Sequence, residues 1–587
     1  MYIEKINCAN DLKKLNVQEL NDLAGEIRQG LMNRLSKKGG HFGPNFGFVE
    51  ATIALHYVFN SPVDKFVFDV SHQSYIHKML TGRKDAYFDD EHFADVSGYT
   101  NPKESDHDFF NVGHTSTSVS LACGLAKGRD LKGDKENIVA IIGDGSLSGG
   151  EALEGVDFAA ELESNFIIVV NDNDMSIAEN HGGLYKNLKL LRQTKGQSEC
   201  NLFKAMGLDY IYVHEGNDIE KLIEAFKKVK DIDHPVVVHL NTLKGKGYEP
   251  AEKEKENWHW CMPFNTENGQ SLYVFEGESY DAMTCDFLMD KMKKDPKVVT
   301  LVAGVPTNIG FTEEKRKKAG KQFVDVGIAE EHAVAMSSGI AKNGGKPVFA
   351  THSSFFQRTY DQISQDLCVN SNSATLLVNT ASVYGMNDVT HLGLYDIPMM
   401  SNIPNLVYLA PTNCEEYFAM LDWSIEQDKY PVAVRIPCNG VVHANDGVKV
   451  DKDYDNLNKY LVNQEGKNIA IIALGDFYQI GEEVAAFIEE KTSVKPTLIN
   501  PRYITGLDNE LLEKLKENHT KVITLEDGIL DGGFGEKIAR FYGPSNMRVY
   551  NYGLKKEFLD RYDVNEVLEI NRITPEKIYE DCMSFDM

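Results

Sequence analysis

Short apolar runs alternate with longer amphipathic stretches along most of the chain. One run, Ile138 to Ile142, consists entirely of apolar residues and ends at a Gly-Asp-Gly turn at positions 143–145. A second run, Phe166 to Val170, ends at Asn171-Asp172-Asn173. Continuous apolar runs of this length are typical of strands buried in a parallel sheet. Because residues 151–154 between the runs favour a helix, the segment is predicted to form one βαβ unit.

The same alternation continues to the C-terminus and predicts an α/β protein with mainly parallel sheets. Helical periodicity runs from Val17 to Leu35. The other predicted strands are Phe66 to Phe68, Val236 to Leu240, Val298 to Val302, Pro347 to Ala350, Ala374 to Val378, Ile469 to Leu474, Pro496 to Ile499 and Lys521 to Leu525. We therefore expect three α/β domains, at residues 1–275, 276–445 and 446–587, with the polar stretch 451–458 leading into the third.

Polar side chains stand where the first two strands end. Asp144 and Asn173 follow strands that neighbour each other in one βαβ unit, and open α/β sheets bind ligands at the carboxyl ends of their strands. Oxygen ligands of this kind suit Mg²⁺, which is held by one or two carboxylates together with a ligand's phosphates. An ordinary polar turn would explain either motif alone, but the pair at a spacing of roughly 30 residues is more specific.

The composition and net charge of the chain limit the kinds of molecule that the protein is expected to bind. The 587 residues include 61 Lys and Arg against 88 Asp and Glu, a net charge of −27, which argues against nucleic acid as a partner. An anionic substrate would then require a local basic pocket. Nine scattered cysteines without a CxxC pair indicate reduced thiols and favour a cytoplasmic protein. No apolar run reaches the length of a membrane span, and the first residues lack a signal-peptide core.

The Gly-Asp-Gly and Asn-Asp-Asn motifs together resemble the signature of thiamine diphosphate enzymes. The sequence around them resembles the 1-deoxy-D-xylulose-5-phosphate synthases, a family related to transketolase, nearly from end to end. The resemblance implies a transketolase-like fold, thiamine diphosphate and Mg²⁺ as cofactors, a homodimer and a role in isoprenoid precursor biosynthesis. It also implies that the three expected domains are, in order, diphosphate-binding, pyrimidine-binding and C-terminal transketolase-like.

The resemblance assigns most cofactor contacts to particular residues. Glu330 is implied to activate the cofactor through its aminopyrimidine ring, and Phe355 to pack on that ring. The implied metal ligands are Asp144, Asn173 and Met175, and the other implied cofactor contacts are His72, Gly113, His114, Thr115, Gly145, Ser146, Lys244 and Tyr248. Lys244 suits a diphosphate as a compact charge. A predicted helix start after residues 113–118 would offer free N–H groups to an anion, although an ordinary capped helix has the same pattern.

Histidines and one arginine are the candidates for catalysis and substrate binding. Alongside Glu330, the implied catalytic residues are His41, His259 and His391, and the implied substrate contacts are His41, His352, Arg358 and His391. Local structure would also explain several of them. A histidine in a glycine-rich turn forms local hydrogen bonds, His72 would fit a protein core, and Arg358 would fit an internal ion pair. The tryptophans at positions 258 and 260 would then anchor an interface around His259.

Several positions depart from the family pattern. Thr380 and Cys438 stand where the family carries the two arginines that hold the acceptor's phosphate. Asn379 and Asn387 replace aspartates, and His352 replaces a common tyrosine. Two further departures are a serine at position 71, where glycine is usual, and a shortened segment at 178–201. We therefore expect an intact cofactor site beside an altered acceptor site.

The favoured reaction is decarboxylation of pyruvate with transfer of the two-carbon unit to D-glyceraldehyde 3-phosphate. The altered acceptor residues keep open a related transketolase-type transferase with another donor or acceptor. A non-catalytic family member is a third possibility, which the joint presence of Asp144, Asn173 and Glu330 disfavours. A nicotinamide dehydrogenase is disfavoured because no complete GxGxxG motif opens a βαβ unit. The expected partners are thus small molecules and a second copy of the chain, without nucleic acid or membrane.

Overall fold

The computed structural model describes residues 1–273, 275–445 and 450–584, which divide into two compact units. The first unit comprises Met1–Glu276 with Gly327–Ala329, and the second comprises Gly277–Val326 with Glu330–Met587. The predicted domain boundary at residue 446 lies outside the described residues.

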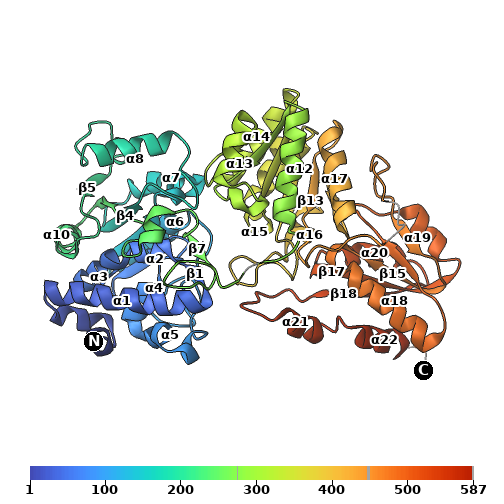
Figure 1. Cartoon of the computed structure of the whole chain (residues 1–587), viewed down its shortest axis with the longest axis horizontal. Helices are drawn as coiled ribbons and strands as arrows, with labels where there is room; N and C mark the ends of the chain where they lie inside the picture. The colour runs from blue at the N-terminus through green and yellow to red at the C-terminus, as the bar shows by residue number, and fades with distance from the viewer. Residues whose placement is uncertain (274, 446–449, 585–587) are drawn as a thin grey trace. The chain divides into compact units, whose positions relative to one another are not determined.

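A five-stranded parallel sheet forms the centre of the first unit, in the order β2-β3-β4-β6-β5 (Figure 1). Its strands are β2 (Lys65–Phe68), β3 (Ile138–Gly143), β4 (Phe166–Asp172), β5 (Asp209–Val213) and β6 (Pro235–Asn241). Nearly every residue of β3 and β4 is buried, which explains their continuous apolar runs. Gly143 pairs with Asn171, so the chain leaves β3 and β4 side by side.

Helices cover both faces of this sheet (Figure 1). One face packs on α1 (Val17–Lys38), α3 (Val49–Val58) and α10 (Ile219–Val229), and the other on α6 (Ser118–Lys132), α7 (Gly150–Ala159) and α8 (Gly183–Gln193). Successive strand residues belong to the two faces in turn, as the period of a β-strand requires. The predicted helix from Val17 is confirmed, and it continues to Lys38 before Gly39 turns with a φ of 73°.

Two sheets make up the second unit. The first is parallel throughout, in the order β12-β13-β11-β10-β8-β9, and contains β8 (Val298–Val302), β9 (Phe323–Asp325), β10 (Lys346–His352), β11 (Thr375–Asn379), β12 (Val407–Leu409) and β13 (Val432–Arg435). Helices α12 (Tyr280–Lys294) and α17 (Cys414–Glu426) cover one face, and α14 (Glu330–Lys342) covers the other.

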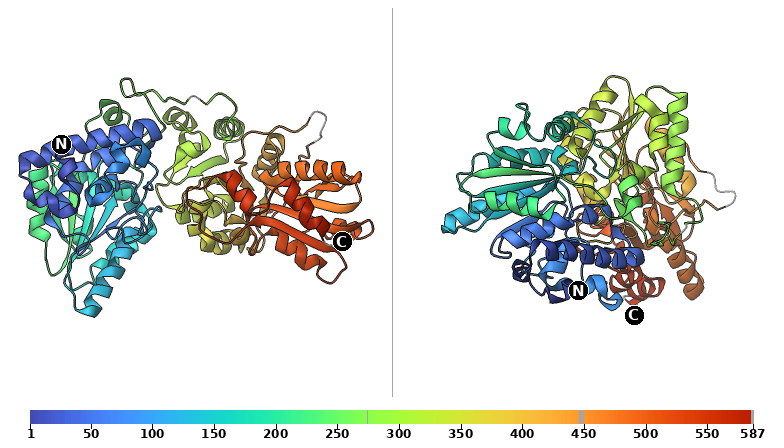
Figure 2. Two further views of the ribbon diagram at one scale, coloured as in Figure 1. Left: turned by 90° about the horizontal axis from the view of Figure 1, so that it is seen from below. Right: turned by 60° about the vertical axis from the view of Figure 1, so that its left-hand side comes forward.

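The second sheet of this unit, drawn in orange and red in Figure 2, has the strand order β14-β16-β15-β17-β18. It contains β14 (Leu461–Gln464), β15 (Asn468–Ala473), β16 (Thr497–Asn500), β17 (His519–Ile529) and β18 (Arg548–Leu554), and only the edge strand β14 runs antiparallel. It packs between α18 (Tyr478–Thr492) and α22 (Pro575–Met583) on one face and α19 (Asn509–Leu515) and α20 (Phe534–Tyr542) on the other. The predicted α/β class with mainly parallel sheets is confirmed.

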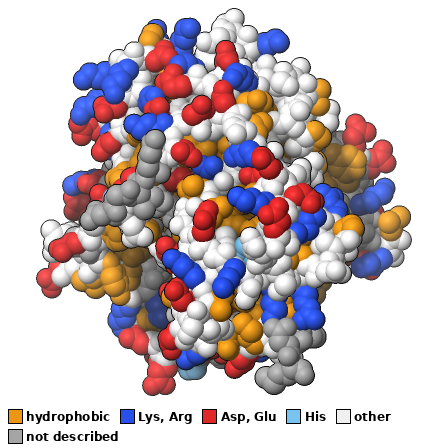
Figure 3. Space-filling model, turned by 90° about the vertical axis from the view of Figure 1, so that its right-hand side faces the viewer, with side chains coloured by type: hydrophobic (Ala, Val, Ile, Leu, Met, Phe, Trp, Pro, Cys, Tyr) orange, Lys and Arg blue, Asp and Glu red, His pale blue; other side chains and the backbone are white. Residues whose placement is uncertain are grey.

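Charged side chains of both signs are mixed on one face of the molecule, and the cysteines are unpaired. On the face shown in Figure 3, Lys and Arg side chains lie among Asp and Glu side chains instead of gathering into one basic patch. All nine cysteines are free thiols. Within the described part of the chain, no helix is both long and apolar enough to cross a membrane.

Candidate active-site residues in the two units

The ends of β3 and β4 bring two predicted metal ligands together. Asp144 follows β3 directly, is 1% exposed, and donates its backbone N–H to the Asn171 carbonyl oxygen at 3.1 Å. The backbone N–H of Asn173 hydrogen-bonds to the Asp144 carboxylate. Among the described residues nothing hydrogen-bonds to the buried Oδ1 atom of Asn173. A buried acceptor without a donor is uncommon, and a cation would satisfy it.

The electrostatics of this loop also favour a cation. Burial, together with the charge of Asp172, raises the pKa of Asp144 to about 8. Burial acts in the same direction on Asp172, but His239 and Arg192 hold the pKa of that carboxyl below its usual range. Asp144 is therefore the carboxyl that lacks compensation, and a divalent cation beside it would favour its charged form.

The donor set fits Mg²⁺ held jointly with a diphosphate. Asp144 and Asn173 offer oxygen atoms, and a thioether is a poor ligand for Mg²⁺, so Met175 would contribute its carbonyl oxygen. In the described ranges, no group of three or more His, Cys, Asp and Glu side chains could hold a metal by itself. Gly145 allows the loop to approach closely, since a Cβ atom there would lie 2.7 Å from the Ser176 hydroxyl.

Lys244 supplies a buried positive charge in the same unit. It is 2% exposed, and its ammonium donates to the Ser176 carbonyl oxygen at 2.6 Å. Burial lowers its pKa to about 7. The negative charge of Asp144 opposes this shift, and an anionic ligand would favour the charged form of Lys244 in the same way. Tyr248, four residues later, packs its ring against Phe42 and Trp258.

Three predicted histidines form a cluster in the first unit. The ring centroids of His41 and His72 lie 5.0 Å apart, and His259 lies 5.6 Å from His41 and 5.3 Å from His72. Strands β1 (Gly40–His41) and β7 (Trp260–Cys261) pair His41 with Trp260 and so bring His259 close. Burial lowers the pKa of His259 well below its usual value, which keeps this imidazole neutral. A neutral imidazole offers one donor and one acceptor to a substrate.

Two residues that the sequence patterns did not reveal hold this cluster in place. Asn45 donates to the carbonyl oxygens of His41 and His72, at 2.8 and 2.7 Å, and thereby ties their two loops together. The Tyr99 ring lies 5.8 Å from that of His41. Trp258, in contrast, is buried in the core of this unit, while Trp260 is 49% exposed.

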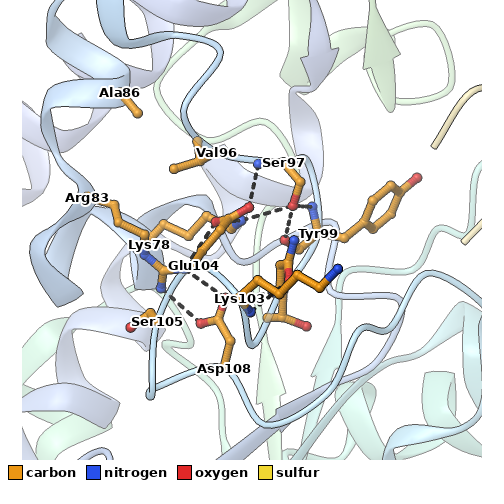
Figure 4. A network of polar contacts seen from close by, with 12 residues as sticks. Lys78, Arg83, Ala86, Val96, Ser97, Tyr99, Lys103, Glu104, Ser105 and Asp108 are labelled. Atoms are coloured by element: carbon orange, nitrogen blue, oxygen red, sulfur yellow. Dashed lines mark hydrogen bonds and ion pairs between the residues drawn. The ribbon is translucent and has the colours of Figure 1, made fainter. Parts of the chain in front are cut away.

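The Tyr99 loop is anchored by a buried network of charges (Figure 4). Lys78 donates to Glu104 at 2.6 Å, and Arg83 contacts Glu104 at 3.3 Å and both oxygens of Asp108 at 2.7 and 2.9 Å. These four side chains point toward one another, while the Tyr99 ring points away from them. The backbone N–H of Ser97, two residues before Tyr99, donates to Glu104 at 2.7 Å and so joins the loop to this network. Removing one partner of a buried ion pair costs roughly 3–5 kcal/mol.

The predicted anion site at the start of α6 needs a correction. The Asp69 carboxylate accepts from the backbone N–H groups of Ser116 and Ser118, at 2.9 and 3.0 Å, so these groups are not free for a ligand. Gly113, His114 and Thr115 lie in the loop just before this capped start, and Ser146 accepts a bond from the Ser116 hydroxyl through its carbonyl oxygen. Ser71 has a φ of 63°, which explains why glycine suits that position.

The second unit contains the predicted activating carboxylate. Glu330 begins α14, is 3% exposed, and its Oε2 atom has no hydrogen-bond partner among the described residues. Burial raises its pKa to about 7, against the opposing charge of Arg358, whose nearest guanidinium nitrogen lies 3.9 Å away. Phe355 is half-buried between His352 and His391, with ring centroids 5.2 and 5.7 Å apart. Burial lowers the pKa of His391 to about 4, so it too is neutral.

Residues that depart from the family pattern bond to one another at the ends of β10 and β11. His352 and Asn379 pair in register. The two ring nitrogens of His352 lie 3.0 Å from the Thr380 hydroxyl and 2.6 Å from the Asn308 amide nitrogen. Asn379 donates to the Asn308 carbonyl oxygen at 2.8 Å. These polar groups are thus satisfied within the protein.

The other altered position lies in an acidic environment. The backbone N–H of Cys438 donates to Asp476 at 3.0 Å. Arg435, the arginine that is retained nearby, already pairs with Asp527 and with Asp396, the latter at 3.0 Å. Asn387 donates to a carbonyl oxygen more than 170 residues further along the chain, that of Tyr562, at 3.2 Å.

The segment 178–201 contains α8 and contacts residues at the ends of β3 and β4. Asn180 donates to Asp144 Oδ2 at 2.7 Å, and Arg192 pairs with Asp172 and Asp174. Neither residue was predicted, because a side chain that reaches a loop 18 to 36 residues away leaves no local pattern in the sequence.

Comparisons with known proteins agree with these observations. A family model described as 1-deoxy-D-xylulose-5-phosphate synthase matches residues 3–200 and 192–242. The transketolase pyrimidine-binding model matches residues 280–440, and the transketolase C-terminal model matches residues 458–578.

Individual relatives match over most of their length. A protein of Halothermothrix orenii named 1-deoxy-D-xylulose-5-phosphate synthase is 36% identical, covering 99% of this chain and 96% of its own. One of the same name from Lachnoclostridium phytofermentans is 38% identical, covering 92% and 91%. Among solved structures, a transketolase from Campylobacter jejuni is 17% identical with a TM-score of 0.45, covering 97% of this chain and 100% of that one.

Proposed function

The chain belongs to the 1-deoxy-D-xylulose-5-phosphate synthase family, a group of thiamine diphosphate-dependent enzymes, and we propose that it decarboxylates pyruvate and joins the two-carbon unit to an aldehyde. D-Glyceraldehyde 3-phosphate is the acceptor that this family assignment favours. The observation that carries the proposal is the pair of buried, unsatisfied oxygen atoms on Asn173 and Glu330, which are two residues implied to contact the cofactor.

The first unit is proposed to hold the charged end of the cofactor. Asp144, Asn173 and the carbonyl oxygen of Met175 would bind Mg²⁺, and Lys244 would contact the diphosphate. The remaining proposed contacts of this unit are His72, Gly113, His114, Thr115, Gly145, Ser146 and Tyr248. Bound thiamine diphosphate supplies the electron sink for the carbon–carbon chemistry.

The second unit is proposed to hold and activate the ring end. With a pKa of about 7, the Glu330 carboxyl is poised both to donate and to accept a proton at neutral pH. Arg358 lies close enough to orient this carboxyl without removing its proton. Phe355 presents a half-buried aromatic surface on which a ring can pack.

The neutral histidines are proposed to handle the substrate. His41 and His259 would hydrogen-bond the reacting groups and move protons at their ring nitrogens, while His352 and His391 would border the acceptor. Neutral His259 and His391 avoid a fixed positive charge and keep both donor and acceptor capacity.

The organisation of the protein completes the proposal. Residues 1–275 would bind diphosphate, 276–445 pyrimidine, and 446–587 would form the C-terminal domain, as the matched family models support. We further propose a cytoplasmic homodimer that binds neither nucleic acid nor membranes. The net charge of −27 supports the exclusion of nucleic acid.

Product analysis tests the proposed reaction. Purified protein with Mg²⁺, thiamine diphosphate, pyruvate and an aldehyde should release CO₂ and form a ketose one two-carbon unit longer than the aldehyde. Mass spectrometry would identify the ketose, and Asp144→Ala provides the inactive control. If no CO₂ is released from pyruvate with any aldehyde, the proposed reaction is wrong.

A second candidate is a transketolase-type transferase with another donor or acceptor. The mutual bonding of His352, Thr380 and Asn379 favours a different acceptor, because these positions offer no charge to a phosphate. A ketose phosphate supplied in place of pyruvate would distinguish the two reactions, since only the transferase would consume it.

A further inference from the structure

The loop that carries Asn173 has a strained backbone. Asp174, the next residue, has a φ of 61°, in the left-handed region that non-glycine residues rarely occupy. Such a conformation costs on the order of 1–3 kcal/mol and persists only where surrounding contacts hold it. The contacts around Asp174 therefore determine where the Asn173 side chain lies.

One guanidinium holds the loop on both sides of Asn173. Arg192, from α8, donates through one nitrogen to both carboxylate oxygens of Asp172, at 2.6 and 2.7 Å. Its other terminal nitrogen pairs with Asp174. The backbone N–H of Asp174 also donates to Asp172 at 3.1 Å, so the loop and the guanidinium form one closed set of bonds.

The Asp172 carboxylate is itself fixed from the opposite side. His239 on β6 lies 2.8 Å from its second oxygen, and Tyr210 on β5 lies 2.7 Å from the other ring nitrogen of His239. The Asp172 and His239 side chains are fully buried. Arg192 thus connects a rigid chain of side chains to a loop residue, Asp174, whose own side chain is 59% exposed.

A purely structural ion pair would not need this arrangement. Asp172 is already held in β4, where it pairs in register with Asn241 of β6, so the sheet does not depend on Arg192. Arg192 instead bridges the two residues that flank Asn173, whose Oδ1 atom has no hydrogen-bond partner among the described residues.

We propose that Arg192 is a positioning residue for the metal, which holds the loop 171–175 so that Asn173 Oδ1 and the Asp144 carboxylate face one divalent cation. The shortened segment, as α8, would then form the outer layer of the metal site. The inference rests on the proposed binding of Mg²⁺ by these two residues. Outer-layer residues of metal sites affect metal affinity by roughly 10- to 100-fold.

Metal affinity of variants tests the inference directly. Mg²⁺ is titrated by calorimetry into protein with thiamine diphosphate present, and the dissociation constant is measured for the unmodified chain, Arg192→Lys and Arg192→Met. We expect Arg192→Met to weaken Mg²⁺ binding about 10- to 100-fold. Arg192→Lys should fall between, because an ammonium cannot span both carboxylates. At saturating Mg²⁺, kcat should return close to that of the unmodified chain.

Arg129→Met is the matched control. Arg129 is even more buried in this unit than Arg192 and likewise pairs with an aspartate, Asp130. It reaches the carbonyl oxygens of Glu136 and Asn165, however, near the opposite ends of β3 and β4. The Arg129→Met variant should have lower thermal stability but an unchanged Mg²⁺ dissociation constant. An equal loss of Mg²⁺ affinity in this control would show that general destabilisation, and not loop position, is responsible.

A rescue variant keeps the inference open to refutation even if Arg192→Met is unstable. Glycine adopts a φ of 61° without strain, so Asp174→Gly should restore part of the Mg²⁺ affinity in both Arg192 variants. Unchanged affinity in a folded Arg192 variant, or no recovery with Asp174→Gly, would overturn the inference. Absence of Mg²⁺ binding by the unmodified chain would instead refute the proposed cofactor site.

Discussion

The loops after β3 and β4 in the first unit and the loops after β10 and β11 in the second occupy equivalent places on their sheets. In the first, Asn173 keeps a buried oxygen atom without a partner, and burial disfavours the charge of Asp144. In the second, His352, Thr380 and Asn379 hydrogen-bond to Asn308 or to each other. Buried polar groups without a hydrogen-bond partner in the protein indicate that a ligand binds there. Polar groups that hydrogen-bond to one another do not require a ligand, and these offer no charge to a phosphate.

Removing the Asp144 carboxylate, the proposed metal ligand, should have the largest effect of the predicted changes. Asp144→Ala is expected to abolish thiamine diphosphate binding measurable by calorimetry, because Mg²⁺ loses its one charged protein ligand in the proposed set. Asp134→Ala, in the exposed turn before β3, is the control and should bind normally. Normal thiamine diphosphate binding by Asp144→Ala would show that Asp144 is not a metal ligand.

Changing Glu330 tests whether the second unit supplies the group that activates the cofactor. Glu330→Gln should still bind thiamine diphosphate but exchange the cofactor's C2 proton about 10²- to 10⁴-fold more slowly, since an amide cannot transfer the activating proton. Proton exchange is followed by NMR in deuterated water. If the exchange rate does not change, another carboxylate must activate the cofactor.

Restoring the two arginines tests the acceptor region. A charged hydrogen bond contributes roughly 1.5–3 kcal/mol, which corresponds to about one to two orders of magnitude in affinity. The double variant Thr380→Arg and Cys438→Arg should therefore lower the KM for D-glyceraldehyde 3-phosphate. We expect a decrease of about one to two orders of magnitude for each arginine that reaches the phosphate. Because Asp476 accepts from the Cys438 N–H, adding Asp476→Asn should strengthen the effect. Steady-state kinetics with unphosphorylated D-glyceraldehyde provide the control, whose KM should not fall.

The pH dependence of stability is the smallest predicted effect. Since burial raises the pKa of Glu330 from 4.5 to about 7, the folded state keeps this proton over a range in which the unfolded state loses it. The resulting destabilisation of the folded state is absent below about pH 4.5, grows between pH 4.5 and 7, and is complete above pH 7. Cofactor-free Glu330→Gln should thus be more stable than the unmodified chain by up to about 3 kcal/mol at pH 8. Thermal unfolding should show the difference shrinking at pH 5, and a pH-independent difference would contradict the account.

The sequence was most informative where structure is local. Strands such as β3 and β4 are buried on both faces, so each appears as an unbroken apolar run, and the polar residue after each run lies at the sheet's ligand-binding edge. The family resemblance then supplied roles for Glu330 and the histidines, which no local pattern reveals.

Long-range side-chain contacts could not be predicted. Asp69 caps residues 47 and 49 positions away, and Arg192 reaches a loop 18 to 20 positions away. Such pairs depend on how strands and helices pack, and neither partner differs from an ordinary surface charge in the sequence. The hydrogen bonds among the altered acceptor residues could not be predicted for the same reason, although each substitution is visible in the sequence by itself.

The most direct test of the contrast between the two regions is the unmodified enzyme's choice of acceptor. The kcat/KM values for D-glyceraldehyde 3-phosphate and for unphosphorylated D-glyceraldehyde are measured with pyruvate, Mg²⁺ and thiamine diphosphate. The account predicts ready release of CO₂ from pyruvate together with little or no preference for the phosphorylated triose, because Thr380 and Cys438 offer its phosphate no positive charge. A strong preference for the phosphorylated triose would contradict it and would mean that another cation, such as Arg358, binds the phosphate.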